Sequence, residues 1–166
     1  LRQGMTANGI IGDKQDEIIR SITSFALYGF PESHAASFAL IAYASAYLKC
    51  HHLAAFTAAI LNNQPMGFYS PATIVKDAQR HGLRVRPIDV RVSDWPCTLE
   101  RHAQSALALR LGLRYIDGMR ESSARALVLE RGRAPFTSID DLTRRVPELQ
   151  KQEIVTLAAV GALNAA

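Results

Sequence analysis

The stretch from Ala35 to Leu48 constrains the fold most, because it contains no charged residue and only two serines. Such a run is a membrane span, a core helix or a helix with special neighbours. A membrane span needs roughly 18–20 uninterrupted apolar residues, and this run is shorter and rich in Ala and Ser. We therefore exclude a membrane segment and predict a helix over about 33–52 that is surrounded by protein.

The composition is typical of a soluble globular protein in a reducing compartment. Hydrophobic residues make up 48% and charged residues 20% of the chain, which excludes a disordered protein. The two cysteines, Cys50 and Cys97, lie far apart, which argues against a disulfide framework. The net charge of +4 mildly favours an anionic partner. Because the chain begins with Leu and has no leader, we interpret it as an internal piece of a longer protein.

Periodicity predicts a mainly α-helical chain with a few short strands. Helices are predicted over about 14–26, 33–52, 53–62, 71–82 and 121–131, after Ser138, and over the last stretch; strands are predicted over 83–90 and 106–113. We place a domain boundary near residue 100. Residues 1–100 contain nine Lys and Arg against eight Asp and Glu, and residues 101–166 contain ten against seven, so the basic excess lies mainly after the boundary.

The stretch LRYIDGMRESSARALVLER predicts a hairpin of two short helices. Its apolar positions suit packing of one helix on the other and are Leu113, Ile116, Met119, Ala124 and Leu127. Gly118 lies at the tight turn, where a positive φ or a close backbone approach needs glycine. The free amides at the start of the second helix, together with the helix dipole, suit a phosphate group.

Side chains around this turn add donors and positive charge. Ser122 and Ser123 can donate hydrogen bonds, and Arg120 and Arg125 can pair with phosphates. A site of this kind reads the nucleic-acid backbone, so its binding should be independent of base sequence and sensitive to salt. A plain helical hairpin with solvated arginines is the alternative.

The hairpin resembles the helix-hairpin-helix motif, a nonspecific DNA-binding element. The turn of that motif is usually Gly, an apolar residue and Gly, whereas this chain has Gly118, Met119 and Arg120. The Arg120 side chain is expected to reach the phosphate in place of the missing glycine. The resemblance implies that the DNA-binding residues are Gly118, Met119, Arg120, Ser122, Ser123 and Arg125.

The opening stretch YGFPESHAASFALIAYASAYLKCHH resembles the fingers region of bacterial C-family DNA polymerases, the family of the replicative alpha subunit. The matching positions are Tyr28, Gly29, Phe30, Ser33, His34, Ala35, Tyr43, Leu48, Lys49 and His52. The stretches LNNQPMGFYSPATIVKDAQRHG and RPIDVRVSDWPCTLE are more similar to the error-prone members of the family. The resemblance implies a helical fingers subdomain over 1–100, followed by a helix-hairpin-helix subdomain over 101–166.

The resemblance also implies what the parent protein does. It would be a cytoplasmic, template-directed DNA polymerase that uses Mg²⁺ and extends primers past damage. Its partners would be primer-template DNA, deoxynucleoside triphosphates, the sliding clamp and accessory mutagenesis proteins. No segment matches the palm motif whose aspartates hold Mg²⁺, so we expect no catalytic residue and no metal site in this chain. Ser33 and His34, at the start of the apolar helix, are candidates for the nucleotide pocket.

Three alternatives to this function stay open. The parent could be the replicative DNA polymerase III alpha subunit itself, the chain could be a noncatalytic helix-hairpin-helix module, or it could be a purely structural helical domain. At the level of single residues, His34 could instead brace its helix. Asp140 and Asp141 are interpreted as helix-capping residues. Cys50 and its histidine neighbours are too close in sequence for a zinc site.

Overall fold

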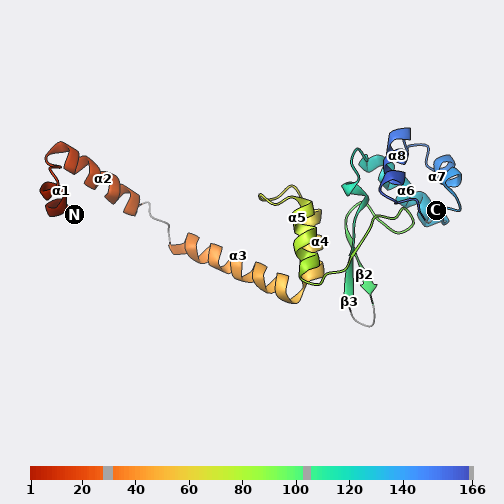
Figure 1. The fold of residues 1–166 in the computed structure, drawn as a ribbon, viewed down its shortest axis with the longest axis horizontal. Coiled ribbons are helices and arrows are strands. Elements are labelled where there is room, and N and C mark those ends of the chain that lie inside the picture. The colour runs from red at the N-terminus through yellow and green to blue at the C-terminus, as the bar shows by residue number, and fades with distance from the viewer. Residues whose placement is uncertain (28–31, 103–105, 165–166) are drawn as a thin grey trace. The chain divides into compact units, whose positions relative to one another are not determined.

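The computed structural model describes residues 1–27, 32–102 and 106–164, without the side chains of residues 25–27, 32 and 33 (Figure 1). The predicted fold class is confirmed, because helices predominate and a single small sheet accompanies them. The structure forms two compact units, Leu1–Ala46 and Tyr47–Ala166. No helix in the described ranges is long and apolar enough to cross a membrane.

In the first unit, a buried glutamine joins two helices. Helix α1 (Arg2–Ala7) was not predicted, since it is too short for apolar periodicity, and α2 (Asp13–Leu27) follows it. The Gln15 Nε2 donates to the carbonyl oxygens of Arg2 at 3.0 Å and Ile10 at 3.2 Å. These bonds fix the start of α2 against α1 and the loop between them.

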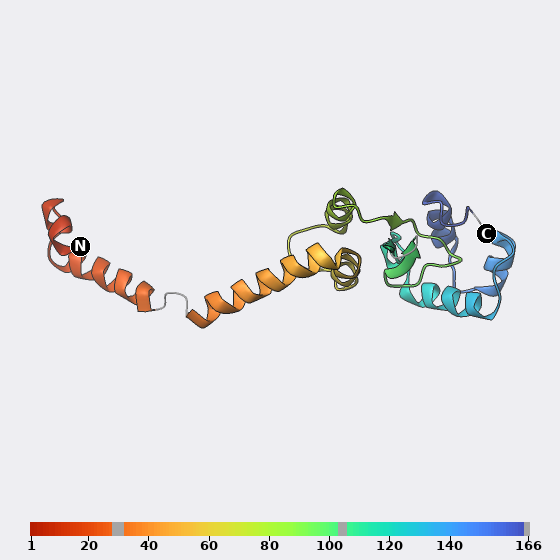
Figure 2. The same cartoon turned by 90° about the horizontal axis from the view of Figure 1, so that it is seen from below.

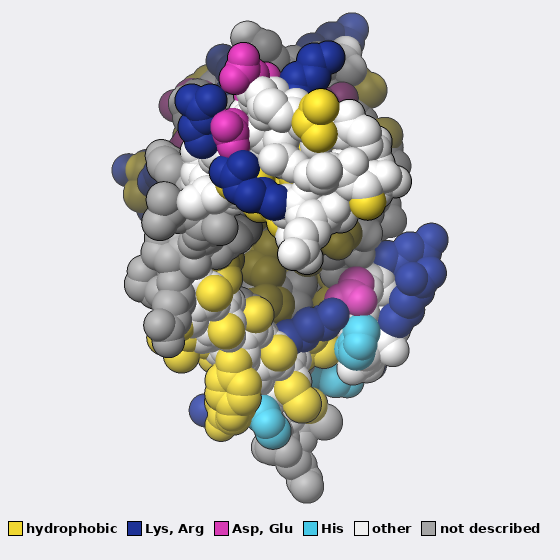
Figure 3. Space-filling model, turned by 90° about the vertical axis from the view of Figure 1, so that its left-hand side faces the viewer, with side chains coloured by type: hydrophobic (Ala, Val, Ile, Leu, Met, Phe, Trp, Pro, Cys, Tyr) yellow, Lys and Arg dark blue, Asp and Glu magenta, His cyan; other side chains and the backbone are white. Residues whose placement is uncertain are grey.

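Helix α3 (Glu32–His51) contains the apolar run. The helix is confirmed, but the prediction that protein surrounds it is wrong for the residues that the structure describes. Phe38, Leu40, Ile41 and Tyr43 are all more than half exposed, and Figure 3 shows hydrophobic side chains gathered on an open surface. A helix that is apolar on every side needs neighbours all round it, and the described parts of this chain do not provide them.

The second unit begins its core with two helices, α4 (Leu53–Asn62) and α5 (Pro71–Arg80). As predicted, Ser70 and Pro71 start α5, with the Ser70 Oγ accepting a hydrogen bond from the Thr73 amide at 3.3 Å. The fully buried Leu61 of α4 packs with Ala78 of α5 in one apolar cluster.

A three-stranded sheet adjoins these helices, with strand order β1-β3-β2. Strand β1 (Val85–Arg86) runs parallel to β3 (Ala106–Arg110), and β2 (Thr98–His102) runs antiparallel to it. The alternation of leucines predicted β3, although the strand ends at Arg110. Strand β2 was not among the predicted strands. Its charged residues obscure the alternation of apolar and polar residues that predicts a strand. One of them, Glu100, binds Arg110 of β3 at 2.6 Å.

The C-terminal residues form a second core from three helices and one 3₁₀ turn. These elements are η1 (Leu113–Tyr115), α6 (Glu121–Arg133), α7 (Ile139–Arg145) and α8 (Lys151–Ala159), seen together in Figures 1 and 2. All five apolar positions of the predicted hairpin are buried in this core. The first arm of the hairpin is only the single turn of η1.

The two cores of the second unit are joined at the end of α4. The side chain of Asn62 exchanges hydrogen bonds with the backbone of Cys97, at 2.7 and 2.9 Å. Arg114 donates to the carbonyl oxygen of Asn62 at 2.7 Å, and the Tyr115 hydroxyl donates to that of Leu61 at 2.7 Å. Residues of η1 therefore satisfy carbonyl groups that the end of a helix leaves without partners.

We predict that Gly112→Ala destabilises the second unit. A Cβ at this position would lie 2.4 Å from the carbonyl carbon of Pro96 and from the carbonyl oxygen of Trp95, so the backbone would have to move. Overpacking of this kind costs about 1–3 kcal/mol. Trp95 is the single tryptophan of the chain, so its fluorescence can follow urea denaturation.

Gly132→Ala is the matched control. Gly132 lies inside α6, where a Cβ would meet nothing within 4 Å, and alanine there favours the helix by up to about 1 kcal/mol. An unchanged urea midpoint for Gly112→Ala would contradict the close contact between residue 112 and the segment 95–96.

Candidate nucleic-acid interface

The predicted turn lies on the surface of the C-terminal core. Its backbone closes with a hydrogen bond from the Met119 amide to the Ile116 carbonyl oxygen at 3.2 Å. Gly118 has a φ of 72° and is exposed. A Cβ on Gly118 would meet nothing within 4 Å, so the backbone conformation is what requires glycine. The buried side chains of Ile116 and Met119 anchor the turn.

Helix α6 begins directly after this turn and has no side-chain cap. Arg120 is its N-cap and makes no capping hydrogen bond. Within the described part of the chain, the amides of Glu121, Ser122 and Ser123 make no hydrogen bond. Of these three, the amides of the exposed residues Glu121 and Ser122 stay available at the positive end of a helix dipole, which is a suitable arrangement for an anion, whereas Ser123 is fully buried.

Two predicted contact residues flank these amides on the surface. Ser122 is exposed, and the Arg125 side chain is 71% exposed. Arg125 contacts Glu121 one turn earlier, at 2.6 Å. Exposed pairs of this kind contribute only about 0–1 kcal/mol. A phosphate can therefore compete for the Arg125 guanidinium.

Arg120 and Ser123, which were also predicted to contact DNA, both bind the buried carboxylate of Glu153. The Arg120 amide and guanidinium donate to Glu153 at 2.9–3.2 Å. The Ser123 hydroxyl donates to Glu153 and to the Glu148 carbonyl oxygen, both at 3.1 Å. These bonds hold the turn in place. Because Ser123 is fully buried, its hydroxyl cannot contact a ligand from solvent.

Hydrogen bonding controls the ionisation of Glu153. Burial alone would raise the pKa of this carboxyl, but the bonds from Arg120, the Gln150 amide and Ser123 outweigh burial and hold the pKa at about 2. The same contact raises the pKa of Arg120, because its guanidinium donates to the carboxylate. Glu153 is therefore ionised throughout the neutral range.

A second hairpin, which the sequence analysis missed, stands opposite the first. Its turn closes with a bond from the Leu149 amide to the Val146 carbonyl oxygen at 3.1 Å, and it leads into α8. Leu149 and Val146 occupy the places that Met119 and Ile116 have in the first hairpin. The turn contains no glycine, so it gave no sequence signal. Its first helical residue, Lys151, is exposed.

The residues predicted for the nucleotide pocket lie at the start of α3. The His34 ring meets the Phe38 ring edge to face, with the centroids 4.5 Å apart and the planes at 84°. The side chain of Ser33 and residues 28–31 of the polymerase-like stretch lie outside the described residues. The structure thus gives a position for His34 alone.

Ser138 and Asp141 cap α7, so the capping prediction is confirmed for Asp141, while Asp140 lies in the first turn of the helix. The Ser138 Oγ accepts from the Asp141 amide at 3.0 Å, and Asp141 accepts from the Thr137 amide at 3.2 Å. Among the residues with described positions, no group of three His, Cys, Asp or Glu side chains could hold a metal ion.

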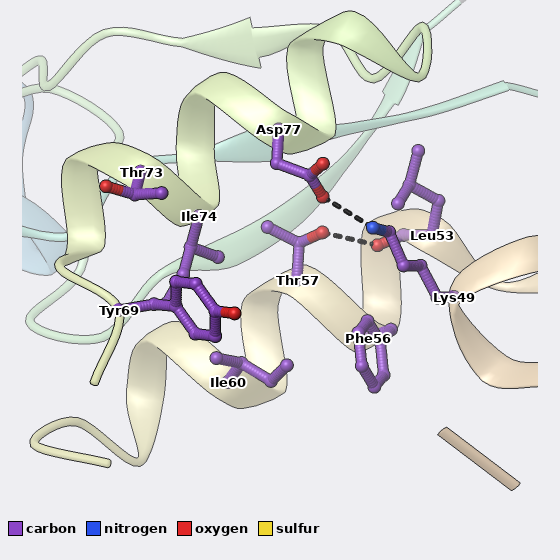
Figure 4. A pocket seen from close by; sticks show the side chains of 9 residues that line it. All are labelled: Lys49, Leu53, Phe56, Thr57, Ile60, Tyr69, Thr73, Ile74 and Asp77. Atoms are coloured by element: carbon purple, nitrogen blue, oxygen red, sulfur yellow. Dashed lines mark hydrogen bonds and ion pairs between the residues drawn. The ribbon is translucent and has the colours of Figure 1, made fainter. Parts of the chain in front are cut away.

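A pocket of about 390 Å³ lies between α4 and α5 (Figure 4). Leu53, Phe56 and Ile60 give it an apolar wall. At one end, the Lys49 Nζ binds Asp77 at 2.7 Å, and this hydrogen bond lowers the pKa of the Asp77 carboxyl. Because its cation is already paired and its wall is apolar, the pocket does not suit a phosphate.

Comparison with known protein families supports the presence of helix-hairpin-helix structure in the second unit. A family model described as a helix-hairpin-helix motif matches residues 82–166. The chain belongs to this helix-hairpin-helix family. Its match extends over the sheet and both hairpins of the second unit, so the family region begins before the boundary near residue 100.

Relatives match almost the full chain. An error-prone DNA polymerase of Alkalilimnicola ehrlichii is 50% identical over 99% of the chain, and those of Methylococcus capsulatus and an Azoarcus species are 50% and 52% identical over 99%. The chain spans only 16%, 17% and 16% of these relatives, respectively. The resemblance read from the sequence is thereby confirmed.

We predict that Glu153→Gln destabilises the C-terminal core at neutral pH by about 1–3 kcal/mol, since it weakens charge-assisted hydrogen bonds from buried donors. The folded-state pKa of Glu153 lies below its ordinary value of 4.5. Its contribution to stability is therefore present above pH 4.5 and declines as the pH falls toward 2. Urea denaturation followed by Trp95 fluorescence at a series of pH values measures both effects.

Glu148→Gln is the control, because its side chain is exposed on the neighbouring turn. The stability difference between the parent chain and Glu153→Gln should shrink between pH 4.5 and pH 2. A difference that stays constant with pH would show that Glu153 is not the group whose ionisation stabilises the turn.

Proposed function

We propose that the C-terminal hairpins bind the sugar-phosphate backbone of duplex DNA without sequence preference. The proposal rests on the exposed Gly118 turn, which leads into a helix whose first two amides lie on exposed residues and have no acceptor in the described part of the chain. Backbone amides and the helix dipole recognise phosphates and do not read bases. Membership of the helix-hairpin-helix family supports this interpretation.

The six residues proposed for DNA binding divide into two roles. Gly118, Ser122 and Arg125 lie on the surface and would face the phosphates. The remaining three fix the turn, and these are Met119, Arg120 and Ser123. We add Lys151 of the second hairpin to the contact residues, because it is exposed at the first position of α8.

We further propose that the parent protein is a template-directed DNA polymerase that extends primers past damage. The names of the relatives support an error-prone enzyme over the replicative alpha subunit. Deoxynucleoside triphosphates, the sliding clamp, accessory mutagenesis proteins and the cytoplasm belong to this proposal. The polymerase would use Mg²⁺, but the described residues do not fit a metal ion, so we assign none of them a role in holding it.

Within that polymerase, residues 1–100 would belong to the fingers and residues 101–166 to the duplex-binding part. Ser33 and His34 would then lie near the incoming nucleotide, at the start of α3. The proposal for these two residues is supported by the resemblance of their stretch to the fingers region of C-family polymerases.

The proposed DNA contact is tested with the double variant Arg125→Ala, Lys151→Ala. Each lost phosphate contact reduces the salt dependence of log K by about 0.9 for each log unit of salt, so the slope should become shallower by about 1.8. Affinity should fall equally for duplexes of different sequence. Fluorescence anisotropy of labelled duplex, titrated with the 166-residue chain at several salt concentrations, measures both quantities.

Arg91→Ala, Arg133→Ala is the charge-matched control. Both arginines are exposed and paired with carboxylates, as Arg125 is. Arg91 lies in the loop after β1 and Arg133 in the last turn of α6, so neither borders a hairpin turn. Equal losses of DNA affinity in the two double variants would indicate a diffuse effect of net charge. If neither variant lost affinity, the hairpins would not contact DNA.

A further inference from the structure

A groove of about 410 Å³ lies beside α6 and has no place in the function proposed so far. One wall is the α6 surface, with Arg125, Val128 and Leu129 at helical spacing. The other wall is the segment 94–96, which includes Trp95. We call this feature the α6 groove. Its volume lies within the range of about 300–1,000 Å³ that is typical of ligand sites.

The wall that contains Trp95 is firmly held. The carbonyl oxygens of Asp94 and Trp95 accept hydrogen bonds from the amides of Leu113 and Arg114, at 2.8 and 3.2 Å. The backbone of Gly112, which precedes Leu113, lies so close that a Cβ there would meet this segment. The groove therefore exists before any ligand binds, which reduces the entropic cost of binding.

Two charged side chains, Asp94 and Arg125, line the groove, and each has an ionic partner. Asp94 is the acidic residue of its lining, and its carboxylate binds the guanidinium of Arg131 at 2.6 Å. Arg131 also donates to the carbonyl oxygens of Val90 and Ser93. The Arg131–Asp94 ion pair therefore holds the wall of the groove in place. Arg125, by contrast, is exposed at the rim and held only by an exposed pair with Glu121.

Arg125 also connects the groove to the proposed phosphate site. It lies three residues after Ser122, which at about 1.5 Å per residue places the two about 4.5 Å apart along the helix axis. Leu129 lies one further turn along α6, toward the middle of the groove. A strand whose phosphate binds at the start of α6 would thus have an aromatic and aliphatic surface directly beside it.

We propose that the α6 groove holds an unpaired nucleobase of the DNA strand whose phosphate binds at the start of α6. This inference rests on the proposed DNA binding by the hairpin. The flat Trp95 ring and the aliphatic side chains suit stacking with any base. A paired base inside a duplex has both faces covered by its neighbours. The groove therefore favours primer-template DNA with a single-stranded part over blunt duplex.

Trp95 reports directly on this contact, because it is the single tryptophan of the chain. The experiment titrates the 166-residue chain with a primed duplex that has a template overhang, and with a blunt duplex of equal paired length. We expect the overhang to quench Trp95 fluorescence and the blunt duplex to leave it nearly unchanged. Anisotropy of the same labelled DNAs gives the affinities.

Leu129→Gln tests the groove without changing its charge. Leu129 is 62% exposed, so the variant should keep its fold. Loss of this apolar contact should weaken binding of the overhang DNA several-fold and leave binding of the blunt duplex unchanged. Val155→Gln is the matched control, since Val155 is a similarly exposed residue on α8.

Failure of this inference can be distinguished from failure of the proposed function. If both DNAs bind but the overhang neither quenches Trp95 nor depends on Leu129, the inference is wrong, and the groove is left for an apolar side chain of another protein. Equal quenching by both DNAs also overturns it. If neither DNA binds, the hairpin proposal itself is wrong.

Discussion

The C-terminal core depends on one buried carboxylate. Glu153 is 3% exposed and accepts hydrogen bonds from both hairpins, namely from Arg120 and Ser123 of the first and from the Gln150 amide of the second. A buried ion is tolerated only when such donors replace its hydration. Because Glu153 ties the two turns together, neither hairpin can move without breaking bonds to the other. Arg120, which in sequence looks like a phosphate contact, is thereby paired with a buried carboxylate, although its side chain stays 45% exposed.

This arrangement changes what the basic excess of the C-terminal part means. Most of its arginines contact carboxylates, and the pairs are Arg110–Glu100, Arg120–Glu153, Arg125–Glu121, Arg131–Asp94, Arg133–Glu130, Arg144–Asp141 and Arg145–Asp141. A simple count of charges therefore overstates the positive electrostatic potential that would attract a polyanion. Affinity for DNA would depend on a few oriented amides at the start of α6, helped by those exposed cations whose partners are weak enough to be displaced.

Local signals in the sequence predicted the elements that local chemistry determines. Ser70 and Ser138 mark helix starts because each caps its own helix, and Gly118 marks a turn because its backbone needs a positive φ. Strand β2 and the role of Glu153 were beyond such signals. Both depend on partners distant in sequence, in β3 and in the opposite hairpin, and no local pattern encodes those pairings.

The link between the two cores of the second unit connects the first hairpin with helix α4. The same 3₁₀ turn that leads into Gly118 also donates, through Arg114 and Tyr115, to the last carbonyl groups of α4. The segment that forms a wall of the α6 groove continues into Cys97, which is bonded to Asn62 at the end of α4. A strand bound at α6 would therefore contact a surface that is connected, within a few hydrogen bonds, to the helices α4 and α5. The surface proposed to bind DNA and the end of α4 thus belong to one hydrogen-bonded framework.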